Sequence, residues 1–187
     1  MKYLITGLGN PGEQYAHTRH NIGFDILDAL AEASNISFQD RRYGFISEFR
    51  HKSRTFHLLK PTTYVNLSGH AVHYYLKKFK IPESNLLVIA DDLALPFGKL
   101  RLKPSGGDSG HNGLNHIITI LGTKNFARLR FGIGNDFPKG YQVEHVLGHW
   151  SGDEKSALPE KIDLACEIIK SFGTIGIEFT MNQFNKN

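Results

Sequence analysis

The sequence predicts an α/β fold in which one β-sheet lies between layers of helices. Short apolar segments typical of strands alternate along the chain with segments whose apolar residues recur at helical spacing. The run LLVIA at residues 86–90 is apolar throughout, which is typical of a strand covered on both faces. The alternation and the buried strand together indicate a sheet sandwiched between helices.

The expected elements begin with a strand, a loop and a helix. Residues 2–8 form an apolar strand that runs into a glycine-rich turn, and residues 20–33 have the apolar spacing of a helix. Residues 104–110 are so rich in glycine and serine that we expect a flexible loop there. The remaining strands are expected at residues 43–50, 55–60, 86–90, 98–103 and 128–132, and the remaining helices at residues 69–80, 112–121 and 160–172.

The length of the chain fits one domain. At 187 residues it can bury a core of ordinary size, and no second domain is needed. Its 40% hydrophobic and 21% charged residues lie in the normal range of globular proteins, and no repeat or low-complexity tract is present. We therefore expect residues 1–187 to form a single domain.

Cysteine usage and the start of the chain bear on its location. The single cysteine, Cys166, cannot form an internal disulfide, so nothing indicates an oxidising compartment. The first apolar run is broken by glycines before it reaches the length of a signal peptide or membrane span. A cytoplasmic location without a membrane is the expectation. The histidines and the cysteine lack zinc-ligand spacing, so no metal is expected.

Positive charge is concentrated in the middle of the chain. The formal net charge is +4, but six Lys or Arg residues and one acid lie between Lys99 and Arg130. From Ser151 to the end, acids outnumber bases by six to four. This asymmetry suggests one face that meets a polyanion, although charge alone fits a solvated surface without a partner equally well.

The glycine-rich segment GLGNPG at residues 7–12 partly matches a dinucleotide-binding turn. Its glycines have the spacing G-x-G-x-x-G, but Pro11 and the polar run after it delay the helix whose N-terminus would hold a pyrophosphate. A nucleotide cofactor is therefore not expected. The loop instead presents Asn10 at the end of the first strand, where ligands of open α/β sheets bind.

His20 and Asp91 form a candidate acid–base pair. Histidine titrates near neutral pH without a large perturbation, and His20 stands at the start of an expected helix. Asp91 follows the buried strand, where a carboxylate could hold an imidazole ring in one tautomer. Each residue alone has an ordinary explanation, since a histidine there is more often a cap or surface residue and a strand-end acid is commonly a turn residue.

Two motifs add amide side chains to this pair. They are PTTYVNLSG at residues 61–69, which contains Asn66, and GHNGL at residues 110–114, which contains Asn112. A turn would explain Asn66 and a helix cap would explain Asn112. With Asn10, His20 and Asp91 they offer donors for an ester carbonyl and acceptors for water, but no good serine or cysteine nucleophile. The set favours general-base attack by water.

The same motifs closely resemble those of the bacterial-type peptidyl-tRNA hydrolases, in the same order and at the same spacing over nearly the whole chain. The resemblance rests on GLGNPG, TRHN, PTTYVNLSG, DDLALPFGKLRLK, SGGDSGHNGL and RLRFGIG. It implies one phosphorylase/hydrolase-like α/β domain with a twisted mixed sheet between helices, usually monomeric. It also implies hydrolysis of the ester that joins a peptide to the 3′ end of a tRNA.

The resemblance implies a role for each site residue. His20 would deprotonate the attacking water, Asp91 would bind its other ring nitrogen, and Asn112 would position the water and stabilise the oxyanion. Asn10 and Asn66 would bind the peptide end and the terminal adenosine. Lys103 and Arg130 would form a phosphate clamp, and His111 would lie along the acceptor stem. The residues expected to contact tRNA are Tyr15, Tyr64, Asn66, Lys103, His111, Asn112 and Arg130.

A few positions depart from the family pattern or vary within it, among them Asp92 and Ala94, where the family often has an acidic residue. Val65 stands where methionine is common, which would give the peptide channel a smaller wall. Asp108 puts a negative charge in the loop that would face the polyanion, so slightly weaker tRNA binding is expected.

Two other classes of function stay open. Some relatives of these hydrolases bind RNA without turnover, and the basic middle of the chain would serve that role equally well. A pure RNA-binding protein, however, has no physical need to keep His20, Asp91 and the three asparagines together. A peptidase on a related fold would need a nucleophile in the site, and the only cysteine lies on the apolar stripe of another expected helix.

Overall fold

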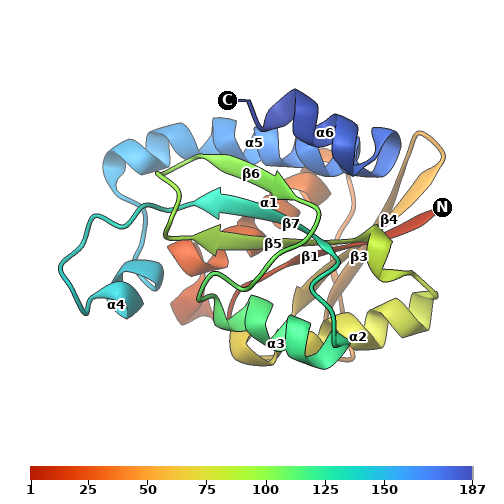
Figure 1. Ribbon diagram of the computed structural model, residues 1–187, viewed down its shortest axis with the longest axis horizontal. Coiled ribbons are helices and arrows are strands. Elements are labelled where there is room, and N and C mark those ends of the chain that lie inside the picture. Colours follow the sequence, from red (N-terminus) through yellow and green to blue (C-terminus); the bar gives the residue numbers. More distant parts are fainter. Residues whose placement is uncertain (187) are drawn as a thin grey trace.

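The computed structural model describes residues 1–186, in which seven strands form one mixed sheet between two layers of helices (Figure 1). The four central strands run parallel: β4 (Arg54–Pro61), β1 (Lys2–Gly7), β5 (Leu86–Asp92) and β7 (Ala127–Gly132). The outer strands run antiparallel to their neighbours: β2 (Gln39–Arg41), β3 (Gly44–His51) and β6 (Leu100–Lys103). The order β2-β3-β4-β1-β5-β7-β6 confirms the predicted α/β class and mixed sheet.

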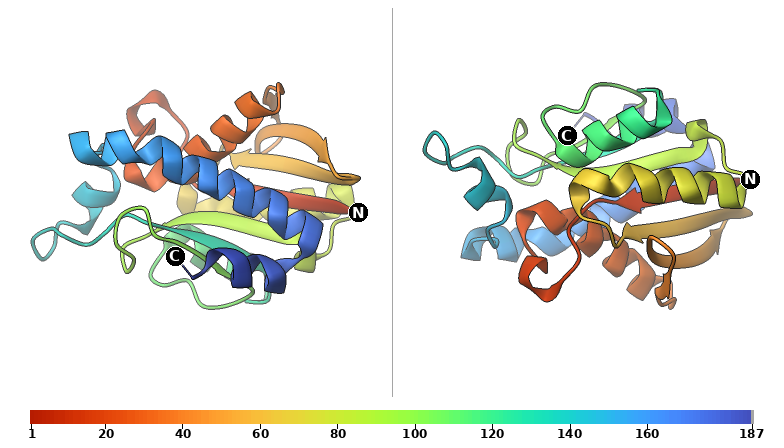
Figure 2. Two further views of the ribbon diagram at one scale, coloured as in Figure 1. Left: turned by 90° about the horizontal axis from the view of Figure 1, so that it is seen from above. Right: turned by 90° about the horizontal axis from the view of Figure 1, so that it is seen from below.

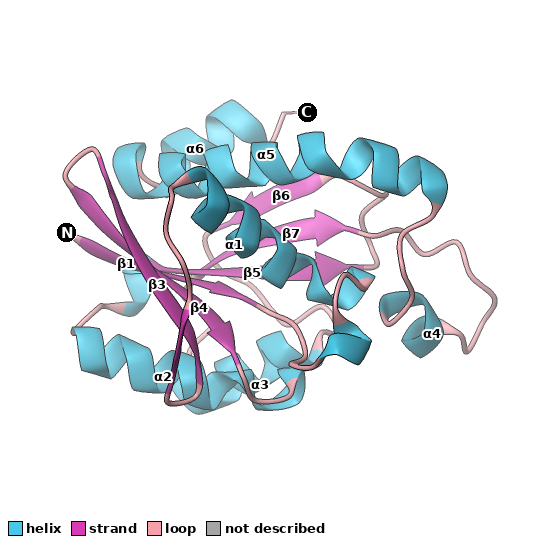
Figure 3. Ribbon diagram, turned by 180° about the vertical axis from the view of Figure 1, so that it is seen from behind, coloured by secondary structure: helices cyan, strands magenta, loops and turns pink. Residues whose placement is uncertain are grey.

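Helices cover both faces of the sheet (Figures 1 and 2). One face packs against α1 (Ile22–Ala33), α5 (Gly152–Ile175) and α6 (Ile177–Phe184), and the other against α2 (Ser68–Phe79) and α3 (Asn112–Leu121). Successive side chains of a strand point to opposite faces, so Ile5 enters the first core and Leu4 the second. Figure 3 shows α1 and α5 together on their face of the sheet.

The central strand β5 positions the site. All seven of its residues are buried, which explains the unbroken apolar run that predicts a doubly covered strand. The strand extends two residues beyond the expected range of 86–90, because Asp91 and Asp92 pair with Phe131 and Gly132 of β7. Both carboxylates are therefore held by the sheet itself at its carboxyl edge.

Several elements differ from the sequence prediction. The three-residue β2 and the five-residue α4 (Gln142–Val146) are too short to show a periodic pattern, and α6 was also not predicted. Helix α5 begins at Gly152, not at residue 160, because Ser151 and Glu154 form a capping box and Pro159 is accommodated inside the helix. Four short 3-10 helices complete the chain: η1 (Glu13–Tyr15), η2 (Arg19–Asn21), η3 (Val65–Leu67) and η4 (Glu83–Asn85).

Three further features concern the single cysteine, possible membrane spans and the expected loop. Cys166 lies in the core with its thiol near the main-chain oxygen of Ile26, and burial raises the pKa of that thiol to about 12. No helix of the described residues is both long enough and apolar enough to cross a membrane. The segment at residues 104–110 contains no helix or strand.

Candidate active site

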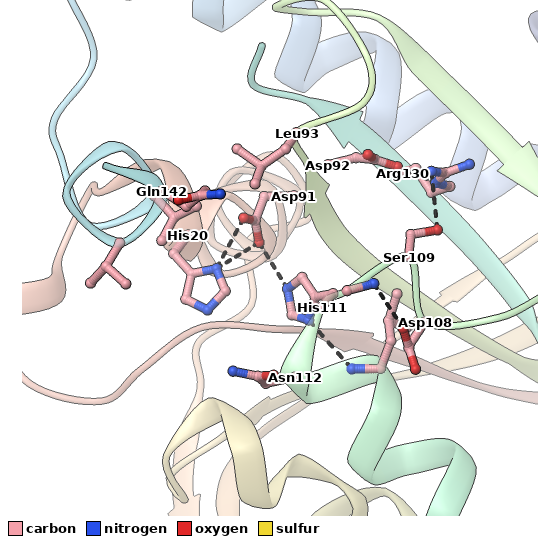
Figure 4. A pocket seen from close by; sticks show the side chains of 14 residues that line it. His20, Asp91, Asp92, Leu93, Asp108, Ser109, His111, Asn112, Arg130 and Gln142 are labelled. Carbon is pink, nitrogen blue, oxygen red and sulfur yellow. Dashed lines mark hydrogen bonds and ion pairs between the residues drawn. The ribbon is translucent and has the colours of Figure 1, made fainter. Parts of the chain in front are cut away.

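A cavity of about 200 Å³ opens at the edge of the sheet where β5 and β7 end (Figure 4). Its polar wall consists of His20, Asp91 and the segment at residues 108–112, with Arg130 of β7 at one side. Its apolar wall includes Val143 and Val146 of α4, which projects beyond the sheet in both views of Figure 2. The cavity therefore brings together five segments that are far apart in the sequence.

His20 is fixed by Asp91. His20 lies in η2, directly before α1, and its Nδ1 is 2.9 and 3.0 Å from the two carboxylate oxygens of Asp91. The Asp91 side chain is only 3% exposed, whereas that of His20 is 13% exposed. Figure 4 shows the second ring nitrogen of His20, Nε2, on the side away from Asp91. This nitrogen is left available to take a proton from a molecule in the cavity.

His111 binds the same carboxylate from the other side. Its Nε2 lies 2.9 Å from Oδ1 of Asp91, while its Nδ1 accepts the main-chain N–H groups of Gly113 and Leu114 at 3.1 and 3.3 Å. Because Nδ1 accepts hydrogen bonds, the ring proton is on Nε2 and is donated to Asp91. His111 thus caps α3 and orients Asp91 at once.

The network sets the charge of both catalytic candidates. Burial would raise the pKa of Asp91, but the electrostatic attraction of His111 and His20 and the hydrogen bonds with both rings hold it well below its usual range. Burial also lowers the pKa of His20, but the attraction of Asp91 and their hydrogen bond outweigh it, so this pKa lies above the ordinary 6.5. Asp91 is ionised at neutral pH and stabilises a proton on His20.

The three asparagines occupy different positions around this pair. Asn112 is the first residue of α3, and Figure 4 shows its side chain at the cavity below His20. Asn10 is nearly buried, and its Oδ1 accepts the N–H of Val65 at 2.8 Å, which leaves its amide nitrogen as the free donor. Asn66 is exposed in η3, next to Val65. Asn10 is therefore linked through Val65 to the segment that carries Asn66, and neither asparagine lines the cavity.

The expected clamp residues share one face of the sheet. Arg130 forms an ion pair with Asp92 and donates to Ser109 Oγ at 3.3 Å. In the β6–β7 pairing Arg130 lies opposite Arg101, whereas Lys103 lies opposite Arg128. Lys103 and Arg130 are therefore offset by two residues along the strands, roughly 7 Å, on the same face. Arg130 lines the cavity, and Lys103 is exposed outside it.

Comparison with known proteins identifies the family. A family model described as peptidyl-tRNA hydrolase matches residues 4–187. The chain belongs to the peptidyl-tRNA hydrolase family. Peptidyl-tRNA hydrolases of Bacteroides fragilis and Phocaeicola vulgatus are 61% and 60% identical to it over 186 residues, covering 100% of each chain. A crystal structure of peptidyl-tRNA hydrolase from Acinetobacter baumannii superimposes with a TM-score of 0.92 and 37% identity, covering 98% of this chain and 94% of that one.

One cluster in this chain could geometrically hold a cation. Among residues 1–186, His20, Asp91 and His111 offer ligand atoms that lie within 4.8 Å of one another. A metal at Nε2 of His111 would require the ring proton to move to Nδ1, which already faces two N–H donors. The donor set therefore fits a hydrogen-bond network better than a metal centre.

Some features of the site were not predicted from sequence. Arg19 binds Glu154 at 2.9 Å and the main-chain oxygen of His145 at 3.2 Å, and so fastens the segment that carries His20 to the end of α4. The sequence signal for this role of Arg19 was its position next to His20 in the motif TRHN. The only sequence signal for the apolar wall formed by α4 was the three-residue spacing between Val143 and Val146.

The remaining site residues predicted from sequence are Tyr15, Tyr64 and Asp108. Tyr15 ends η1 and is half-buried, and Tyr64 is 57% exposed just before η3. Asp108 lines the cavity, and its carboxylate accepts the N–H of Gly110 at 2.7 Å and the side-chain N–H of Asn115 at 2.9 Å. These bonds direct the charge of Asp108 towards α3.

Proposed function

We propose that this chain hydrolyses the ester bond between a peptide, or an N-blocked aminoacyl group, and the 3′ end of tRNA, which releases the peptide and free tRNA. The observation that carries this proposal is the His20–Asp91 pair, whose free imidazole nitrogen faces a cavity that also contains Asn112. Membership of the peptidyl-tRNA hydrolase family supplies the substrate class.

The proposed reaction begins with water. His20 Nε2 takes a proton from a water molecule as its oxygen attacks the ester carbonyl carbon, and Asp91 stabilises the imidazolium that forms. The carbonyl oxygen becomes an oxyanion, to which the amide of Asn112 donates a hydrogen bond. The ester C–O bond then breaks, and His20 returns the proton to the departing ribose oxygen. No covalent enzyme intermediate is involved.

Asn10 and Asn66 are proposed to bind the substrate. The Asn10 amide nitrogen is free to donate because its oxygen is held by Val65 N–H. In the proposal it binds a peptide carbonyl, while exposed Asn66 contacts the terminal adenosine. Val65 is buried beside them, and in the proposal its smaller side chain gives the peptide channel a smaller wall than a methionine would.

The tRNA is proposed to lie across the β6–β7 edge. Lys103 and Arg130 bind a phosphate of the acceptor end, Arg130 with the guanidinium N–H groups that Asp92 and Ser109 leave free. Tyr15, Tyr64 and Asn112 contact the 3′ end nearer the cavity. His111 has both ring nitrogens bound within the protein, so its proposed contribution to tRNA binding is indirect, through Asp91 and the start of α3.

We further propose that residues 1–187 act as one monomeric domain in the cytoplasm without a bound cofactor, since a single chain supplies every group in this scheme. The decisive assay compares an N-acetylated aminoacyl-tRNA with the same tRNA carrying a free amino group. Cleavage of the first and sparing of the second is expected. Tight tRNA binding without any cleavage would instead identify a non-catalytic RNA-binding relative.

A further inference from the structure

Arg128 is a buried cation whose hydrogen bonds all go to the main chain. It is 1% exposed, and its guanidinium donates to the carbonyl groups of Gly106 (2.6 Å), Gly107 (2.9 Å), Lys124 (3.0 Å) and Phe126 (3.2 Å). Its guanidinium carbon lies 4.3 Å from the centre of the Phe126 ring. Burying a guanidinium costs free energy unless its N–H groups are hydrogen-bonded. The bonds to these carbonyl groups offset part of that cost, and they also fix the loop at residues 104–110.

The bonds to Arg128 determine which way the loop amides point. Every peptide bond of the described residues is trans, and the C=O and N–H of a trans peptide point in opposite directions. Because the carbonyls of Gly106 and Gly107 face Arg128, the N–H groups of Gly107 and Asp108 face away from it. Neither N–H donates to another group among residues 1–186. A Cβ added to Gly106 or Gly107 would meet no atom within 4 Å, so the space outside is open.

The surroundings of these two amides favour an anion. Lys103 is exposed directly before the loop, exposed Lys124 accepts the N–H of Gly106 at its main-chain oxygen, and Arg130 contacts Ser109 within the loop. The nearest acid, Asp108, directs its carboxylate to Gly110 and Asn115. Two consecutive outward N–H groups close to these cations form a donor site suited to one phosphate.

We propose that Arg128 is a positioning residue for tRNA recognition, because it holds the N–H groups of Gly107 and Asp108 outward to bind one phosphate of the substrate. The contact is separate from the Lys103–Arg130 pair. The inference rests on the proposed tRNA substrate, and it adds a main-chain phosphate site that depends on a residue which does not itself touch RNA.

Arg128→Lys separates geometry from charge. Lysine keeps the positive charge but cannot reach four carbonyl groups from one nitrogen, so the loop loses its fixed orientation. We expect the KM for full-length N-acetyl-aminoacyl-tRNA to rise about tenfold with kcat unchanged. The slope of log affinity for uncharged tRNA against log salt should fall by about 0.7 to 0.9. Cleavage of N-acetyl-aminoacyl-adenosine should not change. The matched control is Arg101→Lys, because the Arg101 side chain donates to the main-chain oxygen of Asn185 and not to the loop.

A second pair of variants tests the amide directly and stays decisive even if Arg128→Lys does not fold. Gly107→Pro removes the N–H at a position without a positive φ, whereas Gly107→Ala keeps the N–H and fits the open space. We expect Gly107→Pro to weaken tRNA binding about tenfold and Gly107→Ala to leave it unchanged. Native affinity in Gly107→Pro, or equal losses on both substrates in Arg128→Lys, would overturn the inference. Failure of the wild type to cleave any substrate would instead refute the proposed function, because tRNA binding is measured separately.

Discussion

The rings of His20 and His111 lie 4.9 Å apart, and a nitrogen of each lies 2.9 Å from the same oxygen, Oδ1 of Asp91. One carboxylate therefore orients the proposed base and is itself oriented by the cap of α3. Any change at His111 should reach His20 through Asp91, although the two histidines come from opposite sides of the site.

The first prediction concerns pH. His20 must be neutral to accept a proton, and its pKa in the folded protein lies above 6.5, so kcat should rise as pH increases through that raised value. In Asp91→Asn the attraction that raises the pKa is lost while burial still lowers it, so the rise should move to lower pH as maximal kcat falls. Rates measured from pH 5 to 9 test both. Identical pH profiles for the two proteins would contradict the assignment.

The raised pKa of His20 also predicts how the stability of the folded protein depends on pH. A histidine whose folded pKa is raised stabilises the protein most below its unfolded pKa and loses that contribution as pH rises through the folded pKa. The wild type should therefore lose part of its stability advantage over His20→Ala across the window in which its activity increases. Denaturant unfolding at several pH values measures this difference.

The second prediction isolates the base. His20→Ala should lower kcat by on the order of 100-fold or more, with tRNA affinity near normal, because the general base is lost and no proposed phosphate contact changes. His51→Ala on β3, far from the cavity, is the control and should match the wild type. Loss of tRNA binding with unchanged turnover would refute the role of His20.

The third prediction separates the two functions of His111. His111→Ala removes both the cap of α3 and the bond to Asp91, so it should cost about 1 to 2 kcal/mol of stability and lower kcat. Asparagine is also a good helix cap, so His111→Asn should regain most of the stability without regaining full kcat. Thermal unfolding and single-turnover rates provide the comparison. Full activity in His111→Asn would show that the bond to Asp91 is dispensable.

The fourth prediction concerns the Lys103–Arg130 pair. Lys103→Ala and Arg130→Ala should each raise the KM for full-length substrates and reduce the slope of log affinity against log salt by about 0.7 to 0.9. Arg130→Ala leaves the buried Asp92 unpaired, so Arg130→Ala combined with Asp92→Asn is the cleaner variant. A peptide esterified to a nucleoside lacks the phosphate, so neither substitution should change the rate at which it is cleaved. Equal loss on both substrates would place the two cations in the catalytic centre.

The fifth prediction concerns the backbone contact that places His20. A Cβ on Gly23 of α1 would lie 2.5 Å from the main-chain nitrogen of Leu8, so Gly23→Ala should destabilise the protein by about 1 to 3 kcal/mol. It should also lower kcat, because displacing α1 displaces His20. Gly152→Ala at the exposed start of α5 meets no atom within 4 Å and should be neutral or slightly stabilising. Equal unfolding midpoints would refute the close contact.

Local patterns in the sequence were sufficient to predict the α/β class and most of the elements. The apolar run of β5 and the helical spacing of α1 and α3 reflect burial, which depends on residue type at each position. The motifs around His20 and Asp91 also suggested that these two residues would meet, because both follow or precede elements that end at the carboxyl edge of a parallel sheet. Short elements such as α4 carry too few residues for such a pattern.

What the sequence by itself determined is the α/β class, most of the elements, the family and the chemical groups available to the site. Only the tertiary structure decided that His111 is buried against Asp91, that Arg128 is buried beneath the loop, and that Lys103 and Arg130 are offset along their strands. These facts depend on strand register and on turn geometry, which bring together residues distant in the chain. Such contacts satisfy the terminal guanidinium N–H groups of Arg128 and both ring nitrogens of His111, and residue type alone does not reveal where that happens.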